Sequence, residues 1–187
     1  VKQFKGVTST FVINPDGSIE LTHTGTPKMF KLLRFGTKMG ILREFDMVKW
    51  YGRGPHETYF DRKTGGKITL HEKSVADLEH HYMRPQENAN RTDVRFVEFR
   101  NKEGKGLRFE AIGETPICFS SWHYTQEELQ KAKHIHQLPH KDITTVNIDL
   151  NSIGVGGDMP GDAQVREKYK LKPSKVYTYT FRIQPIK

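Results

Sequence analysis

The sequence has very little cysteine and no long apolar run, and each absence excludes a class of protein. Cys118 is the only cysteine among 187 residues, so no disulfide can form within the chain and its stability must come from packing. No apolar stretch is long enough to cross a bilayer, and the amino terminus lacks the hydrophobic core of a signal peptide. We expect a soluble protein without membrane contacts, and these features leave the choice between cytoplasm and periplasm open.

Basic residues are plentiful but never clustered. Lys and Arg number 30 against 22 Asp and Glu, which gives a formal net charge of +8, yet no run of five or six basic residues occurs. No recognition helix or zinc-finger spacing accompanies them, so we predict no binding to nucleic acid. The positive charge is instead typical of a solvated surface, or of a face that contacts an acidic neighbouring domain.

Helical periodicity is nearly absent as well. Short β-rich runs separated by Gly, Pro, Asn and Asp recur from end to end, which is typical of an antiparallel β-sandwich. The one predicted helix begins at the capping residue Thr125, with Glu128 three positions later and Leu129 as its apolar anchor. The predicted strands are residues 10–13 and 18–24, joined by a turn at 14–17, and then 28–38, 94–100, 107–112, 144–150 and 176–183. We predict one all-β domain over residues 1–187.

Two further features of this pattern can be tested by a structure. The run 94–100 carries apolar residues on both of its faces, which predicts one strand that is covered on both sides. Trp50 and Trp122 lie in or beside strand-like runs, which favours core positions over an exposed platform for sugars.

The most distinctive segment is residues 50–62, which read WYGRGPHETYFDR. Glycine permits backbone angles that are closed to other residues, and proline restricts its own φ. Gly52, Gly54 and Pro55 therefore predict a tight loop with a defined path. Glu57 and Arg62 supply polar groups that can hold this path in place.

Three other segments complete a recognisable series. Residues 84–95 read RPQENANRTDVR, residues 134–138 read HIHQL, and residues 153–158 read IGVGGD. In this order, the four segments resemble signatures in the carboxy-terminal domain of lac-type β-galactosidases, which are family 2 glycoside hydrolases. Ala89 stands where many relatives have glycine. The positions that we predict to shape the loops are Gly52, Gly54, Pro55, Glu57, Arg62, Arg84, Glu87, Asn88 and Arg91.

The resemblance implies an antiparallel β-supersandwich, related to galactose mutarotases, at the end of a multidomain enzyme. Because the corresponding domain is longer and the chain begins at Val1, we expect a fragment that is truncated on its amino-terminal side. The expected partners are the catalytic barrel and other domains of the parent enzyme, and unpaired strand edges favour a homo-oligomer. No cofactor is expected in this chain, and any Mg²⁺ or Na⁺ of the parent would bind in its catalytic domain.

Catalysis is not assigned to any residue of this chain. Retaining glycosidases use two carboxyl groups about 5 Å apart, and the resemblance implies that this pair lies on the separate barrel. Glu57 and Glu87 are instead predicted to pin loops through ion pairs or backbone hydrogen bonds. The predicted partners are Arg62, Arg84 and Arg91.

Histidines suggest a metal site that the spacing does not support. On a strand, His134 and His136 would point the same way, and His140 follows shortly. Because no cysteine or acidic residue stands at a recognised ligand spacing, we predict that the chain binds no metal.

The glycine-rich loop departs from the family at a position that bears on substrate. Relatives of the lac type usually continue as GGDDSW, and their tryptophan stacks on sugar in the active site. This chain reads GGDMPGDAQ, so Gly161 takes the tryptophan position and a stacking surface is missing. We predict that Met159, Gly161 and Asp162 form the edge of a galactoside pocket with an altered leaving-group subsite.

These observations predict a noncatalytic carboxy-terminal domain that completes one side of an active-site pocket and packs against the catalytic barrel. Two alternatives stay open: a stand-alone carbohydrate-binding module, and a mutarotase-like aldose epimerase that uses a histidine and a carboxylate. A shared fold does not decide among them.

Overall fold

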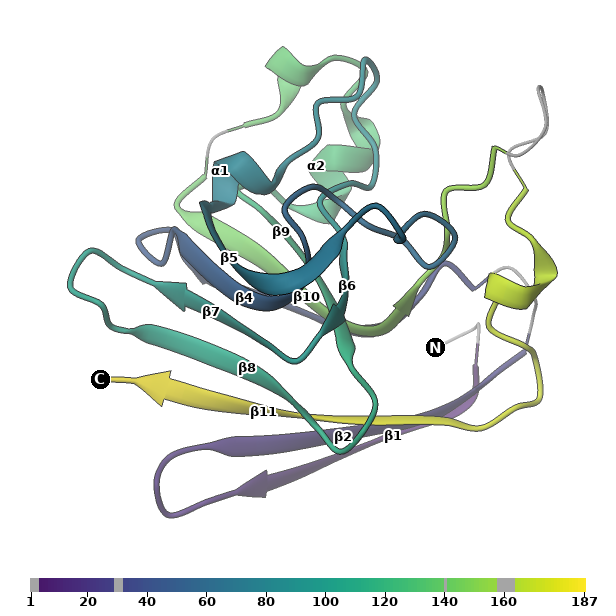
Figure 1. Ribbon diagram of the computed structural model, residues 1–187, viewed down its shortest axis with the longest axis horizontal. Coiled ribbons are helices and arrows are strands. Elements are labelled where there is room, and N and C mark those ends of the chain that lie inside the picture. Colours follow the sequence, from purple (N-terminus) through teal and green to yellow (C-terminus); the bar gives the residue numbers. More distant parts are fainter. Residues whose placement is uncertain (1–3, 29–31, 140, 158–163) are drawn as a thin grey trace.

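A computed structural model describes residues 4–28, 32–139, 141–157 and 164–187. Within these ranges, two antiparallel β-sheets pack against each other (Figure 1). The larger sheet has seven strands in the order β1 (Phe4–Ile13), β2 (Ile19–Pro27), β11 (Tyr177–Ile186), β8 (Gly106–Ile112), β7 (Phe96–Arg100), β4 (Met47–Gly54) and β5 (Lys67–Ser74). The smaller sheet has four strands in the order β3 (Arg34–Leu42), β10 (Ile143–Ser152), β9 (Ile117–Trp122) and β6 (Arg91–Val94). The predicted all-β, antiparallel sandwich is confirmed.

Aromatic side chains from both sheets meet in the core. Trp50 of β4 lies edge-on to Phe119 of β9, with ring centroids 5.7 Å apart, and Phe99 of β7 contacts the same ring at 6.3 Å. Elsewhere in the core, Phe35 of β3 contacts Tyr179 of β11 at 5.7 Å. Large aromatic surfaces buried in this way hold the sheets together. Trp50 and Trp122 are fully buried, as predicted.

Residues 94–100 form parts of two strands, so the prediction of a single strand was wrong. β6 ends at Val94 in the smaller sheet and β7 begins at Phe96 in the larger one. Between them, the Arg95 amide donates to the Tyr51 carbonyl at 2.8 Å, and the Arg95 carbonyl accepts from the Ala111 amide at 2.8 Å. Val94 and Val97 are both fully buried, although a continuous strand would put them on opposite faces. The apolar residues on both faces of the run therefore mark a crossing between sheets.

The other predicted elements are present. The turn after β1 is closed by a 3.0 Å hydrogen bond from the Gly17 amide to the Asn14 carbonyl. Thr125 and Glu128 form a capping box at α2 (Gln126–Lys131), and Leu129 anchors the helix in the core. The strand expected within residues 28–38 is β3, which begins at Arg34. Leu32, which precedes it, is buried. Residues 29–31 lie outside the described part of the chain. The remaining helices are α1 (Val75–Leu78) and the 3₁₀ turns η1 (Ile135–Gln137) and η2 (Glu167–Tyr169).

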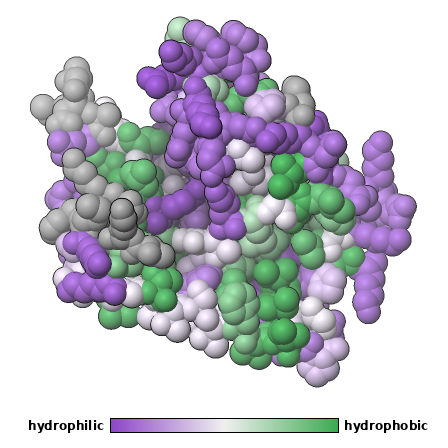
Figure 2. All heavy atoms as spheres, turned by 180° about the vertical axis from the view of Figure 1, so that it is seen from behind, coloured by the Kyte–Doolittle hydropathy of each residue, from purple (hydrophilic) through white to green (hydrophobic). Residues whose placement is uncertain are grey.

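The edge of the larger sheet exposes apolar side chains. Phe11, Val12 and Ile13 at the end of β1 are 62%, 50% and 76% exposed, and because they are consecutive they occupy both faces of the strand. Apolar side chains also gather in the lower part of the face shown in Figure 2. Among the described residues, no helix has the length and apolar character needed to span a membrane.

Candidate functional site

Three loops meet at one end of the two sheets. They are residues 55–66 after β4, residues 79–90 before β6, and residues 153–157 after β10. The first two are joined by a 2.7 Å hydrogen bond from the Thr58 amide to the Asn90 carbonyl and a 2.8 Å bond from Asn90 Nδ2 back to the Thr58 carbonyl. Two of the sequence signatures thus form one interlocked structure.

Glu57 is the acceptor that ties these loops together. Its buried carboxylate accepts hydrogen bonds at Oε1 from Arg62 Nη2 and Tyr82 Oη, each at 2.5 Å. Its other oxygen accepts from the Ala89 amide at 3.0 Å. The predicted role of Glu57, with Arg62 as its partner, is confirmed.

Arg91 does not pair with a carboxylate, contrary to the prediction. Its buried guanidinium donates to the backbone carbonyls of Leu78, Ala89 and Pro55 at 3.0, 2.7 and 2.9 Å, and lies 5.5 Å from the centroid of the Trp50 ring. Burial lowers the pKa of this guanidinium to about 10, with nearby Glu57 opposing the change, so the group stays charged at neutral pH. Arg91 therefore satisfies loop carbonyls that would otherwise lack partners.

Gly52 and Gly54 lie in β4, so the loop predicted for residues 50–62 begins only at Pro55. Both glycines are needed for space and not for unusual backbone angles, which corrects the reason given for them. Neither has a positive φ. A Cβ on Gly52 would lie 2.7 Å from Val94 Cγ2, and one on Gly54 would lie 2.8 Å from the Trp50 ring. Asn88 stabilises the second loop as expected, because its side chain donates to the Gln86 carbonyl at 2.9 Å.

Asp61 attaches the third loop to the first. Its carboxylate accepts from the Val155 amide at 3.1 Å and from the Gly156 amide at 2.8 Å. This contact requires glycine at residue 154, because a Cβ there would lie 2.3 Å from the Asp61 carboxyl group. The signature at residues 50–62 therefore contacts residues 155 and 156 of the glycine-rich signature directly.

Glu87 pairs with a residue that the sequence did not indicate. Arg34 Nη2, from the start of β3, lies 3.1 Å from Glu87 Oε1 and 2.8 Å from Asp149 Oδ2 of β10. Gln126 of α2 donates to Glu87 Oε2 at 2.8 Å. Burial raises the pKa of Asp149 to about 6, although the Arg34 charge opposes this. Arg84, the third predicted partner, is exposed and makes no ion pair with the described residues.

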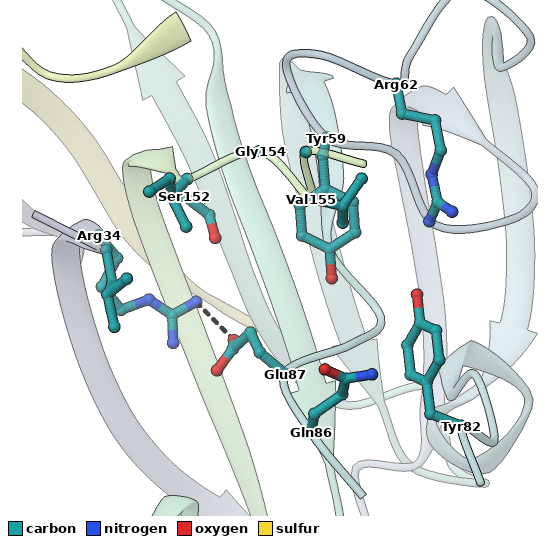
Figure 3. A pocket seen from close by; sticks show the side chains of 12 residues that line it. Arg34, Tyr59, Arg62, Tyr82, Gln86, Glu87, Ser152, Gly154 and Val155 are labelled. Carbon is teal, nitrogen blue, oxygen red and sulfur yellow. Dashed lines mark ion pairs between the residues drawn. The ribbon is translucent and has the colours of Figure 1, made fainter. Parts of the chain in front are cut away.

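Residues of the three loops, together with the start of β3 and the end of β10, line a cavity of about 490 Å³ (Figure 3). The Arg34–Glu87 pair lies on one side, Tyr59, Tyr82 and Arg62 lie on the other, and the third loop forms part of the wall. The Tyr59 side chain is directed into the cavity, and its hydroxyl has no hydrogen-bond partner among the described residues. Burial raises the pKa of Tyr59, and the Glu57 and Glu87 carboxylates raise it further, so this hydroxyl stays protonated.

Sequence reasoning missed Arg34, Asp149, Tyr59 and Tyr82. The two tyrosines had a usable signal, because one lies inside the first signature and the other stands two positions before the second. The predicted pocket-edge residues Met159, Gly161 and Asp162 lie outside the described residues. The loop that leads to them lines the cavity through Gly154, Val155 and Gly156.

The histidine segment forms a short turn, so the strand geometry on which the metal hypothesis depended is not present there. His134 and His136 are exposed at the short turn η1, with their rings stacked 5.5 Å apart, and His140 is not among the described residues. In the described part of the chain, no three His, Cys, Asp or Glu side chains are grouped so that they could hold a metal ion.

The fold and this loop cluster define a class: a two-sheet antiparallel β-sandwich with a cavity between interlocked loops at one end. The chain belongs to the β-galactosidase small-chain family, which it matches over residues 1–183. The β-galactosidase of Priestia megaterium is 35% identical over 95% of this chain and 17% of its own length. Those of Halalkalibacterium halodurans and Streptococcus thermophilus are 32% and 28% identical over 94% and 95% of this chain. The chain covers 18% and 17% of their lengths, less than a fifth of each relative.

Proposed function

We propose that this chain is the carboxy-terminal domain of a β-galactosidase-like glycoside hydrolase and completes one side of the active-site pocket. The observation that carries this proposal is the loop cluster, in which Asp61 holds the third loop at the mouth of a cavity. A domain that shapes a pocket needs such loops fixed in position. The relatives named β-galactosidase are several times longer than this chain, which leaves room for a separate catalytic domain.

The proposed role is noncatalytic. Glu57, Asp61 and Asp149 are all engaged by hydrogen bonds or an ion pair that hold structure together, and Glu87 is paired with Arg34. A retaining glycosidase needs one carboxylate free to attack and another poised to protonate the leaving group. We therefore assign the acid, the nucleophile and any Mg²⁺ or Na⁺ to other domains of the parent enzyme.

The galactoside is proposed to reach this domain at Met159, Gly161 and Asp162. These residues lie a few positions after the cavity-lining segment in sequence. Contact with the catalytic barrel and other domains is proposed through the exposed end of β1 and through the basic surface. In the chain without those domains, the same strand edge would be free to pair with a second copy and form a homo-oligomer.

The loop hypothesis is tested by Gly161→Trp in the longest natural gene product that contains this chain. Because tryptophan supplies a stacking surface for the leaving sugar, the KM for lactose should fall about three- to tenfold, with little change for a galactoside that has a small leaving group. Gly161→Ala is the matched control for the loss of glycine. An unchanged KM for lactose would contradict the proposed position of this loop.

The domain role is tested by comparing that product with the 187-residue chain alone. The product should hydrolyse a chromogenic galactoside and the chain should not. If the chain accelerates the exchange of galactose anomers, it is an epimerase, and if the product shows no hydrolysis, the proposal fails.

A further inference from the structure

The cavity contains polar atoms that the protein itself does not satisfy. Within the described part of the chain, the buried atoms Arg34 Nε, Tyr59 Oη and Glu87 Oε1 have no hydrogen-bond partner, although Glu87 Oε1 lies in ion-pair contact with Arg34. Tyr59 is only 2% exposed, and its hydroxyl is directed into the cavity (Figure 3). Buried polar groups are nearly always hydrogen-bonded, so an unpaired hydroxyl aimed into a cavity indicates a ligand that pairs with it.

Charge around the cavity is balanced. Arg34 lies between Asp149 and Glu87, and Arg62 is paired with Glu57. No cationic group in this set is left without a carboxylate partner, so the cavity has no excess positive charge with which to attract an anion. Glu87 Oε1 keeps lone pairs that can accept a hydrogen bond, and the protonated Tyr59 hydroxyl is a donor as well as an acceptor. This combination fits hydroxyl groups of a neutral ligand.

Much of the remaining wall is apolar, although Gln86 and Ser152 also line it. Leu33, Ile153 and Val155 line the cavity together with Tyr82. Such side chains contact the C–H faces of a ring, while the polar atoms bind its edges. The volume of about 490 Å³ lies within the range of about 300 to 1,000 Å³ found for small-molecule sites.

The wall formed by the third loop is fixed before any ligand arrives. The amides of Val155 and Gly156 are both held by Asp61, and the second loop is held by Glu57 through the Ala89 amide. Preorganised walls reduce the entropy lost on binding.

We propose that this cavity is a binding site for a neutral monosaccharide ring, which donates a hydroxyl to Glu87 and exchanges a hydrogen bond with the Tyr59 hydroxyl. The inference goes beyond the proposed function, because a domain that only edges the parent's pocket does not need to bind sugar by itself. It also does not depend on residues 158–163.

The test is a titration of the 187-residue chain with galactose and with glucose, followed by calorimetry and by ligand-observed NMR. Wild-type protein should bind at least one of them saturably. Tyr59→Phe removes only the hydroxyl and should weaken binding about five- to tenfold. Tyr51→Phe is the matched control, because Tyr51 lies on β4 and does not line the cavity.

Two further measurements keep the result interpretable. Thermal melting shows whether Tyr59→Phe stays folded, which is expected because the substitution removes an unpaired buried hydroxyl. Val155→Trp fills the cavity from its wall and should abolish binding. Glucuronate, which has the same ring and a negative charge, should bind more weakly than glucose.

Three outcomes would overturn the inference: no saturable binding of either sugar, equal affinity in wild type and folded Tyr59→Phe, or tighter binding of glucuronate. Each leaves the domain role intact, provided that the longer product hydrolyses a galactoside. Conversely, if the chain binds sugar but the longer product hydrolyses no galactoside, the proposed function is contradicted while the sugar site in the cavity is supported.

Discussion

At the scale of single residues, carboxylates organise most of the loop end. Glu57 accepts from two side chains and one amide, and Asp61 accepts from two amides. Ionised acceptors form stronger hydrogen bonds than neutral ones, so a few of them can fix loops that have little apolar surface to bury. Asp149 differs, because burial opposes its ionisation.

Asp149 predicts a specific dependence of stability on pH. Its pKa is about 6 in the folded chain against an ordinary value of 3.8, so the folded state binds the proton more tightly. Its favourable contribution to the free energy of unfolding is largest below about pH 4 and decreases as pH rises toward its folded pKa near 6. Above about pH 6 that contribution is lost and does not change further. The total change is about 3 kcal/mol.

The measurement is urea denaturation of wild type and Asp149→Asn at intervals from pH 4 to pH 7. Over this range, wild type should lose stability relative to the variant, because the asparagine side chain does not titrate. Asp142→Asn serves as a control at an exposed position and should run parallel to wild type. A constant difference between wild type and Asp149→Asn would contradict the raised pKa.

At the scale of elements, most strands follow from the sequence, but β4, β5 and the crossing at Arg95 were not predicted. Alternation predicts where extended backbone lies, but apolar residues on both faces of residues 94–100 fit a single covered strand as well as a crossing between sheets, so the sequence does not distinguish the two. The loop signatures likewise identified Glu57, Arg62 and Asn88, whose partners lie in the same loop or in the adjoining signature.

The Arg34–Asp149 pair could not be predicted either, because it depends on contact between strands that are far apart in the sequence. The two residues are separated by 115 positions and come together through the pairing of β3 with β10. β3 and β10 are not joined by a hairpin, so no turn in the sequence indicates that they pair or in what register. The cavity depends on that pairing, so its position could not be predicted although several residues of its rim were.

The attachment of the third loop gives a prediction at this scale. Asp61→Asn keeps the shape of the side chain but replaces one acceptor oxygen with a donor, which cannot accept from an amide. We expect a loss of about 1 to 2 kcal/mol in the free energy of unfolding. The loop amides of Val155 and Gly156 should also exchange hydrogen faster.

Urea denaturation and hydrogen exchange measure the two effects, with Asp142→Asn as the matched control. If Asp61→Asn leaves both stability and exchange unchanged, the loop is held by other contacts.

At the scale of the whole molecule, the exposed end of β1 is the most conspicuous departure from an ordinary surface. Phe11, Val12 and Ile13 present apolar side chains on both faces of an edge strand. Edge strands with apolar side chains pair readily with other chains unless something covers them. The shorter length of this chain, less than a fifth of each named relative, fits a strand that another domain of the parent covers.

This edge predicts self-association of the 187-residue chain. Phe11→Lys combined with Ile13→Lys should shift the chain toward monomer, because like charges on an edge oppose pairing. Sedimentation at several concentrations measures the change, and Met83→Lys is a control at an exposed position outside the strands. A monomeric wild type, or a double variant that associates equally well, would contradict the assignment of this edge.

The close approach of carboxylates to glycines has a consequence for the order in which mutations can accumulate. A Cβ on Gly36 would lie 1.7 Å from Asp149 Oδ1, and one on Gly154 would lie 2.3 Å from the Asp61 carboxyl group. At Gly154 the three nearest atoms all belong to the Asp61 side chain, so a lineage that shortens Asp61 first removes that clash. At Gly36 the backbone Cα of Asp149 also lies 2.7 Å from the added Cβ, so shortening Asp149 leaves a clash. The order of substitution therefore matters at Gly154, where a change of Asp61 must come first, whereas Gly36 is constrained in either order.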